Sequence, residues 1–403
     1  MPNTPPPPFR ATIEESLSIP DLDSDQRSTS SSTQRRWDDP PEEAPPPSLH
    51  HSHSNQQQQP LEPQIENITT MVFLKTVFHK HPFNSEICQL QFSPTGTHLA
   101  VLIPRTLNIR TFHPDEPASI HMISVKDGAR SQLLLNANGL KASAGFALRP
   151  GPDLVIACPF YAKGDSEASY TLPRIEVYDY LRKMRWTKHD VTLRAPVVFS
   201  PDGTMLAGVS TRDSSRIVLA AVSRQSVTVK TMVLKHTDEV TKLAFLPDGT
   251  KLVSCGRDGF VRITSLESGR TLNRIEIGGR AHASILEVAP DGTKVVSVWG
   301  RDVVIWDLSA TGGSGGVHTY NLNAVRGNGT NEGWPLAVSP DCRYIACRTE
   351  EGFDVSDVDT GRFRGDFATA GSVITCATFT KDGKKIAVGN YEGVIQVYDV
   401  ITV

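Results

Sequence analysis

A short stretch of the chain, YDYLRKMRWTK at residues 178 to 188, interleaves basic and aromatic side chains. Such a mixture can contact phosphates and stack on bases, so the stretch could bind RNA or an anionic lipid surface. Its apolar–polar alternation also fits an exposed outer β-strand, on which basic residues discourage pairing with another sheet edge. The sequence favours this second interpretation. The candidate phosphate contacts are Arg182, Lys183, Arg185 and Lys188.

Motifs for catalysis or cofactor binding are absent from the sequence. It contains no phosphate-binding Gly-x-x-x-x-Gly-Lys loop, no Gly-x-Ser-x-Gly elbow and no His-Glu-x-x-His pair. The glycine-rich run 311–316 lacks the lysine that a phosphate loop needs. Most aspartates stand at turns, where they hydrogen-bond the backbone. The sequence therefore predicts a non-catalytic protein with no cofactor and no metal.

Composition and cysteine usage indicate the compartment and the partners. The 403 residues carry a formal net charge of −3, which gives no global attraction to nucleic acid or acidic membranes. The six cysteines lie mostly in apolar runs, with no Cys-x-x-Cys pair, which predicts reduced core thiols. No signal core and no apolar span of membrane length occur. We expect a cytosolic or nuclear protein that does not cross a membrane and binds proteins rather than nucleic acid or lipid.

One tight turn recurs seven times along the chain. Its best copies read Ser-Pro-Asp-Gly or Leu-Pro-Asp-Gly, and the second residues of the seven copies are numbers 94, 150, 201, 247, 290, 340 and 381. Proline presets φ, aspartate bonds its own backbone and glycine accepts positive φ, so each copy suits a turn between antiparallel strands. Apolar runs flank every copy. The spacing of 41 to 56 residues is close to the length of a four-stranded propeller blade.

A third strand follows most copies and often ends in an aromatic residue and aspartate. Examples are Ile175–Asp179, Val303–Asp307 and Ile395–Asp399. With these residues the chain resembles the WD-repeat β-propeller family over roughly residues 70 to 403. The resemblance implies a blade network of His236, Ser254 and Asp258 in the fourth copy, where Thr264 replaces the usual tryptophan. In the fifth copy it implies Trp306 and Asp307, with Gly279 at the histidine position.

Strand counting indicates how the ring closes. We expect outer strands at 118–125, 183–191, 226–234, 271–277, 316–322 and 362–368, which leaves the seventh copy without one. A spare strand at Met71–Phe78 precedes the first copy and could complete the seventh blade. The predicted fold is an all-β, seven-bladed propeller of four-stranded blades, residues 68–403, closed by its N-terminal strand. Residues 1–67 are rich in Pro, Ser and Gln, are acidic, and are expected to be a disordered tail.

The predicted function is a protein-interaction scaffold that presents rim loops to partner proteins, as a monomer or within a larger complex. A rigid ring holds many loops on two rims, so specificity can be spread over several blades. The candidate partner-binding residues are Asp165, Tyr170 and Trp334, which stand in or next to the longer loops. Two alternatives remain: phosphate binding through residues 178–188, and a hydrolase whose carboxylates meet in the central channel without any sequence motif.

Overall fold

The structure is a computed structural model that describes residues 69–75, 86–103, 119–126, 131–136, 145–160, 174–189, 192–223, 226–277, 282–309, 316–322, 333–369 and 373–402. The chain divides into two units, Met1–Pro63 and Gln64–Val403, and every described residue belongs to the second. The expected tail, residues 1–67, lies outside the described residues.

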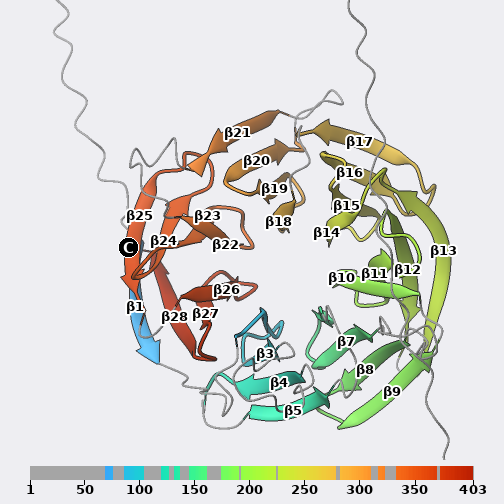
Figure 1. Ribbon diagram of the computed structural model, residues 1–403, viewed down its shortest axis with the longest axis horizontal. Helices are drawn as coiled ribbons and strands as arrows, with labels where there is room; N and C mark the ends of the chain where they lie inside the picture. The colour runs from blue at the N-terminus through green and yellow to red at the C-terminus, as the bar shows by residue number, and fades with distance from the viewer. Residues whose placement is uncertain are drawn as a thin grey trace, which may run out of the picture. The chain divides into compact units, whose positions relative to one another are not determined.

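Seven antiparallel sheets of four strands form the second unit, and they stand around a common centre as the blades of a propeller (Figure 1). Blades 1 to 3 are β2(Gln89–Phe92)–β3(His98–Ile103)–β4(Ser119–Ser124)–β5(Ser131–Asn136), β6(Ala147–Leu148)–β7(Val155–Phe160)–β8(Arg174–Asp179)–β9(Met184–His189) and β10(Leu193–Phe199)–β11(Met205–Ser210)–β12(Arg216–Val222)–β13(Val227–Lys235). Blades 4 and 5 are β14(Val240–Phe245)–β15(Lys251–Gly256)–β16(Phe260–Ser265)–β17(Thr271–Glu276) and β18(Ala283–Val288)–β19(Lys294–Trp299)–β20(Asp302–Asp307)–β21(Val317–Asn321). Blade 6 is β22(Trp334–Val338)–β23(Tyr344–Arg348)–β24(Gly352–Asp357)–β25(Phe363–Ala368), and blade 7 contains β26(Ile374–Phe379), β27(Lys385–Asn390) and β28(Ile395–Thr402). We call the strands of a blade a to d from the centre outward.

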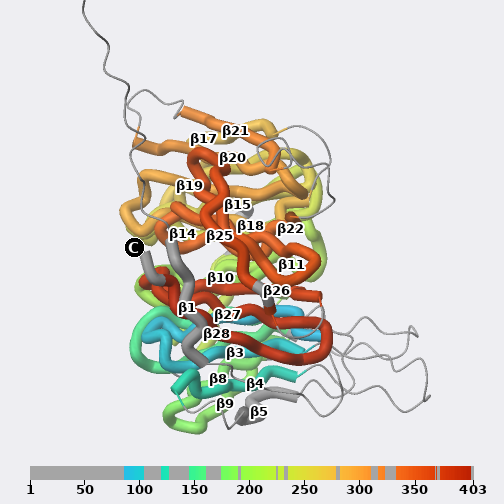
Figure 2. Tube along the Cα trace, turned by 90° about the vertical axis from the view of Figure 1, so that its left-hand side faces the viewer, coloured from blue at the N-terminus to red at the C-terminus, as the bar shows by residue number. Residues whose placement is uncertain are grey.

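The N-terminal strand β1 (Thr69–Lys75) completes blade 7. It pairs with β28 in antiparallel register, with Thr69 opposite Thr402 and Val72 opposite Asp399. Figure 2 shows the propeller turned by 90°, with β26 to β28 toward the viewer. The prediction of ring closure by the N-terminal strand is confirmed, although the strand begins two residues earlier than expected and ends at Lys75. Pairing with β1 leaves β28 inside the sheet, with a partner on each side.

The recurrent turn between strands a and b has the same geometry in six blades. The backbone N–H of its fourth residue donates to the carbonyl of its first, for example Gly203 to Ser200 at 2.8 Å and Gly383 to Thr380 at 2.8 Å. The fourth residue has a positive φ, which glycine adopts at little cost. Blade 6 carries Cys342 at this place with φ 57°. The turn chemistry expected from the sequence is confirmed in these six blades, whereas blade 2 makes a different turn, in which the Val155 N–H donates to the Asp153 carbonyl.

Five of the six expected outer strands occupy the outer position, and blade 1 is the exception. The run 118–125 forms β4, the third strand, and β5 (Ser131–Asn136) is the outer one. The reason is burial. Ile120, Met122 and Ile123 are at most 2% exposed because β4 lies between β3 and β5, within the blade. Their nearly continuous apolar run is typical of an inner strand, and the sequence interpretation was wrong here.

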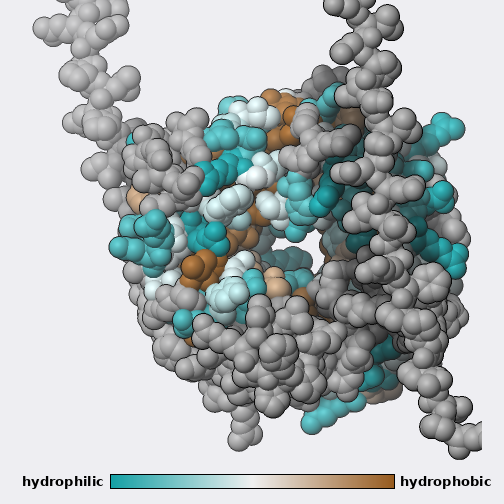
Figure 3. All heavy atoms as spheres, in the orientation of Figure 1, coloured by the Kyte–Doolittle hydropathy of each residue, from teal (hydrophilic) through white to brown (hydrophobic). Residues whose placement is uncertain are grey.

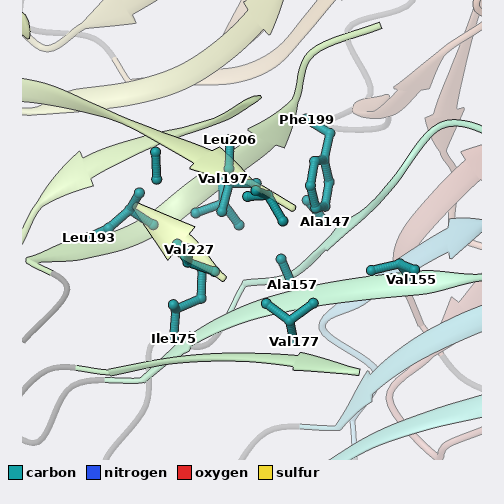
Figure 4. Packing of buried hydrophobic residues seen from close by; sticks show 12 residues of the cluster. Ala147, Val155, Ala157, Ile175, Val177, Leu193, Val197, Phe199, Leu206 and Val227 are labelled. Atoms are coloured by element: carbon teal, nitrogen blue, oxygen red, sulfur yellow. The ribbon is translucent and has the colours of Figure 1, made fainter. Parts of the chain in front are cut away.

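Apolar side chains from facing sheets fill the space between neighbouring blades. Figure 4 shows one such cluster, in which Ile175 and Val177 of blade 2 meet Leu193 and Leu206 of blade 3. All four are fully buried. A buried side chain of this size stabilises the fold by about 2 kcal/mol. This face-to-face packing holds each blade, and therefore its turns, in a fixed position on the ring.

Candidate functional site

The fourth blade holds a buried hydrogen-bonded network. His236 lies just before β14, Ser254 on β15 and Asp258 in the turn between strands b and c. The Nδ1 atom of His236 is 2.9 Å from Oδ1 of Asp258, and its Nε2 atom is 2.8 Å from Oγ of Ser254. Asp258 also accepts from the Thr237 N–H at 2.9 Å and from Arg262 at 2.8 Å. The network joins strands that are distant in sequence.

The pKa shifts define the protonation states in this network. Burial lowers the pKa of His236, so the ring is neutral at pH 7 and carries one proton. A carboxylate needs a donor, which places that proton on Nδ1 and makes Nε2 the acceptor for the Ser254 hydroxyl. Burial acts to raise the pKa of Asp258, but the Thr237 N–H, His236 and Arg262 outweigh it and lower that pKa. Asp258 is therefore a carboxylate.

This Ser–His–Asp arrangement has the contacts of a nucleophilic triad, yet its position gives it a structural role. Ser254 is 2% exposed and His236 is 1% exposed. A substrate carbonyl cannot reach a hydroxyl that is enclosed within the blade. Gly256 shows how closely the groups are packed, since a Cβ there would lie 2.4 Å from Nδ1 of His236. The network therefore fixes the turn to the strands on either side.

The fifth blade uses a different arrangement. Trp306 is buried in the core between blades 4 and 5, whereas Asp307 is exposed and accepts from the N–H and hydroxyl of Ser309. The hydroxyl of Ser297 on strand b accepts a 3.0 Å bond from the indole Nε1 of Trp299. Sequence reasoning missed Trp299, although a tryptophan two residues after the strand-b serine was a usable signal. Gly279, at the histidine position, lies outside the described residues.

The four basic residues of the blade 2 strand divide into two pairs. Arg182 binds Asp179 at 2.6 Å, and Arg185 lies 3.3 Å from Glu176. Both carboxylates are 3% exposed, so the two arginines supply countercharge to groups inside the blade. The other two basic residues, Lys183 and Lys188, are exposed. Lys183 belongs to the turn before β9, and Lys188 lies on β9, the outer strand.

Trp334, a candidate partner contact, lies at the start of β22 and is 49% exposed. The guanidinium of Arg301 stands 5.2 Å from the centre of its ring, which is cation–π geometry. Arg301 comes from the b–c turn of blade 5. Because neighbouring strands are antiparallel, the first strand of a blade begins at the edge of the sheet where the second strand ends. Trp334 and Arg301 therefore belong to the same rim, which is the one that carries the b–c turns. The other two candidates, Asp165 and Tyr170, lie outside the described residues.

Two exposed apolar residues of blade 7 share this rim and were missed from the sequence. Val373 precedes β26 and is 55% exposed, and Tyr391 in the b–c turn is 60% exposed. The Tyr391 N–H donates to the Val373 carbonyl at 3.0 Å, so the two are adjacent. Arg348, opposite Trp334 in the strand register, donates to the carbonyl of Ile374 at 3.3 Å. These contacts join Trp334, Val373 and Tyr391 into one area, which we call the rim surface.

The centre of the propeller is hollow. A cavity of about 440 Å³ is lined by strand a residues of several blades, and Figure 3 shows an opening at this place. Glu287 is the one carboxylic acid among the described residues that line it, so the paired carboxylates of the hydrolase alternative are not found on this lining. The described part of the chain also holds no cluster of three or more His, Cys, Asp or Glu side chains that could bind a metal.

Comparisons with known proteins agree with this architecture. Residues 228–265, which include the whole network of blade 4, match the WD domain, G-beta repeat family. Over 101 residues the chain is 25% identical to the WD repeat-containing protein SL1-17 of Schistosoma mansoni. That match covers 25% of this chain and 31% of the relative, so the chain spans about a third of that protein's length.

No helix in the described ranges is both long enough and apolar enough to cross a bilayer. The family is one whose members commonly serve as interaction scaffolds and are typically non-catalytic. The matched repeat, the sevenfold turn and the topology of the blades together show a seven-bladed propeller that is distantly similar to the WD40 repeat family.

Proposed function

We propose that this propeller is a non-catalytic interaction scaffold of the cytosol or nucleus that binds partner proteins through the rim surface of blades 5 to 7. The observation that carries the proposal is the adjacency of three large exposed apolar side chains, Trp334, Val373 and Tyr391, each about half exposed or more. Tryptophan, tyrosine and arginine are the residues that most often dominate binding energy at protein interfaces. The arginine of this set is Arg301, whose guanidinium lies over the ring of Trp334.

The surroundings of the rim surface favour a basic partner segment. Glu350 and Glu351 stand in the b–c turn of blade 6 next to Arg348, and Glu392 follows Tyr391. All three glutamates are exposed. An apolar centre with an acidic margin matches a partner that inserts an aromatic or aliphatic side chain and carries Lys or Arg beside it. Such a margin would raise the rate of association and make it sensitive to salt.

The test is site-specific photo-crosslinking in cells, with the photoreactive residue placed at Val373 or, as a matched control, at Leu181. Leu181 is 58% exposed and lies in blade 2, away from the rim surface. We expect defined crosslinked proteins from position 373, their loss on Trp334→Ala, and none of the same bands from position 181. Equal crosslinking from both positions, or bands that survive Trp334→Ala and Tyr391→Ala, would contradict the proposal.

The two alternatives have less support. Phosphate binding through β9 would have to rely on Lys183 and Lys188, because Arg182 and Arg185 already neutralise buried carboxylates. A hydrolase would need an accessible nucleophile, and the serine with triad contacts, Ser254, is enclosed.

A further inference from the structure

The central cavity has a polar lining that the scaffold function does not use. Its volume of about 440 Å³ lies within the range of small-molecule sites. Strand a residues from blades 1, 2, 4, 5, 6 and 7 line it. The side chains with polar ends are Gln91, Ser93, Lys242, Ser284, Glu287, Thr378 and Lys381.

In blade 1 the polar side chains of strand a serve the fold. Gln89 exchanges bonds with the backbone of Phe146 in blade 2, donating at 3.0 Å and accepting at 3.3 Å. Gln91 accepts from the N–H of Leu148 at 3.2 Å. The two amides therefore satisfy the inner edge of the next blade, an edge that otherwise has unpaired backbone groups.

Lys242 and Glu287 occupy the matching positions in blades 4 and 5 without this role. Lys242 precedes the proline of its turn by the same number of residues as Gln89 does in blade 1. Glu287 matches Gln91 in the same way. Within the described part of the chain neither side chain takes part in a hydrogen bond or an ion pair. Lys242 lies opposite Cys255 in the strand register, and its charge acts on His282 at the start of blade 5. Among the described residues, no carboxylate therefore pairs with the ammonium of Lys242 in the cavity.

The charge balance of the cavity is positive. Burial raises the pKa of Glu287 to about 8, so at pH 7 this carboxyl is mainly protonated and acts as a donor. Burial also lowers the pKa of Lys242, because no carboxylate compensates the ammonium. Lys381, on the turn of blade 7, adds a second cation to the lining. His282, which lies near Lys242, is neutral at pH 7 because burial lowers its pKa.

We propose that the central cavity is a binding site for a small oxyanion, a carboxylate or phosphate group, with the Lys242 ammonium as its main contact. A bound anion supplies a countercharge to this partly buried lysine, and charge-assisted hydrogen bonds of this kind are the strong ones. A bound anion also acts against the effect of burial on the pKa of Lys242, because it stabilises the charged form of the side chain.

The experiment measures binding of inorganic phosphate and of malonate to the whole protein by titration calorimetry, and the melting temperature in parallel. Sodium chloride at matched ionic strength corrects for general salt effects. We expect saturable binding of at least one anion and a melting temperature that rises with its concentration. The two anions distinguish a phosphate site from a carboxylate site.

Substitutions test the role of Lys242. Lys242→Met removes the charge and keeps the length of the side chain, and Lys242→Gln places the residue type of blade 1 there. We expect both variants to weaken binding about tenfold or more while melting in chloride no lower than the natural protein, because an unpaired buried charge is lost. Lys251→Met is the control: this lysine begins β15 of the same blade, pairs with Asp248 and does not line the cavity, so the variant should bind normally. Undetectable binding of both anions, or unchanged affinity in both Lys242 variants, would overturn the proposal.

Discussion

The Nδ1–H of His236 donates to Oδ1 of Asp258 across 2.9 Å and joins the segment before strand a to the b–c turn of the same blade. The pair is 22 positions apart in sequence and almost fully buried. Asp258 therefore acts as the centre to which His236, Thr237 and Arg262 are attached.

Removal of this carboxylate should destabilise the protein markedly. Asp258→Ala leaves the donors of His236 and Arg262 without a partner, and we expect a loss of about 3 kcal/mol in the free energy of unfolding. Asp248→Ala, at an exposed turn of the same blade, should cost about 1 kcal/mol or less. Urea titration at pH 7 measures both. Equal losses in the free energy of unfolding for the two variants would show that the Asp258 network stabilises the fold no more than an exposed turn does.

The same carboxylate predicts a pH dependence. The folded-state pKa of Asp258 is below its unfolded value, so its contribution is present above about pH 4 and is lost as the pH falls through the folded pKa. The stability difference between the natural protein and Asp258→Ala should therefore shrink in acid. A difference that stays constant from pH 7 to pH 3 would contradict the ionised network.

Glu287 predicts the opposite pH dependence. Its folded-state pKa of about 8 lies above the ordinary 4.5, so the unfolded chain ionises first and stability falls as the pH rises between these values. We expect Glu287→Gln to melt like the natural protein near pH 4.5 and higher than it near pH 8. Glu276→Gln, at an exposed position on β17, is the control and should show no such trend. Melting temperatures of the natural protein and of both variants, measured at several pH values, test this prediction.

The basic strand of blade 2 can be tested by treating its two pairs separately. Arg182→Gln with Arg185→Gln removes the counterion of buried Asp179 and leaves buried Glu176 with Arg174 alone, so we expect a measurable loss in the free energy of unfolding. Lys183→Gln with Lys188→Gln should change stability by about 0.5 kcal/mol or less. Fluorescence anisotropy with single-stranded RNA at physiological salt should show no difference between the natural protein and the lysine pair. A clear loss of RNA affinity in that pair would favour the phosphate-binding alternative.

Closure of the ring predicts that two N-terminal truncations behave differently. Deletion of residues 1–60 should leave the melting temperature unchanged. Deletion of residues 1–75 also removes β1 and exposes the edge of β28, so we expect a large drop in melting temperature together with self-association. Scanning calorimetry and light scattering measure the two effects. The same melting temperature for both truncations would mean that β1 does not stabilise blade 7.

The sequence predicted the fold well because the recurrent turn depends on local chemistry. Asp202 and Asp291 accept from backbone N–H groups two residues later, and Gly203 supplies the positive φ, so each copy specifies its own conformation. The third and fourth strands of blade 1 were harder to place, since 118–125 is apolar along most of its length and the order of strands within a sheet depends on tertiary contacts. Local pattern does not report such contacts.

The candidate sites were less accessible to sequence reasoning. Lys242 begins an apolar run and looks like an ordinary strand-end lysine, and only the closed ring turns it toward a cavity. The rim surface joins residues of different blades, such as Trp334 and Tyr391, that no local pattern connects. The pairing of Arg182 with Asp179 did have a signal, because the two are three residues apart at a tight turn. The sequence interpretation treated the four basic residues as guards of an exposed edge or as phosphate contacts, whereas two of them are counterions of buried carboxylates.

Closure by β1 also has a consequence for biosynthesis. The first strand of the propeller, Thr69–Lys75, pairs with the last, Ile395–Thr402, so it leaves the ribosome long before its partner exists. At translation rates of about 5–20 residues per second, the delay is on the order of tens of seconds. During this time the nascent chain carries an unpaired strand, and completed blades have no neighbour on one side. A long-range contact of this kind makes folding slow, and nascent-chain chaperones would have their greatest effect in this interval.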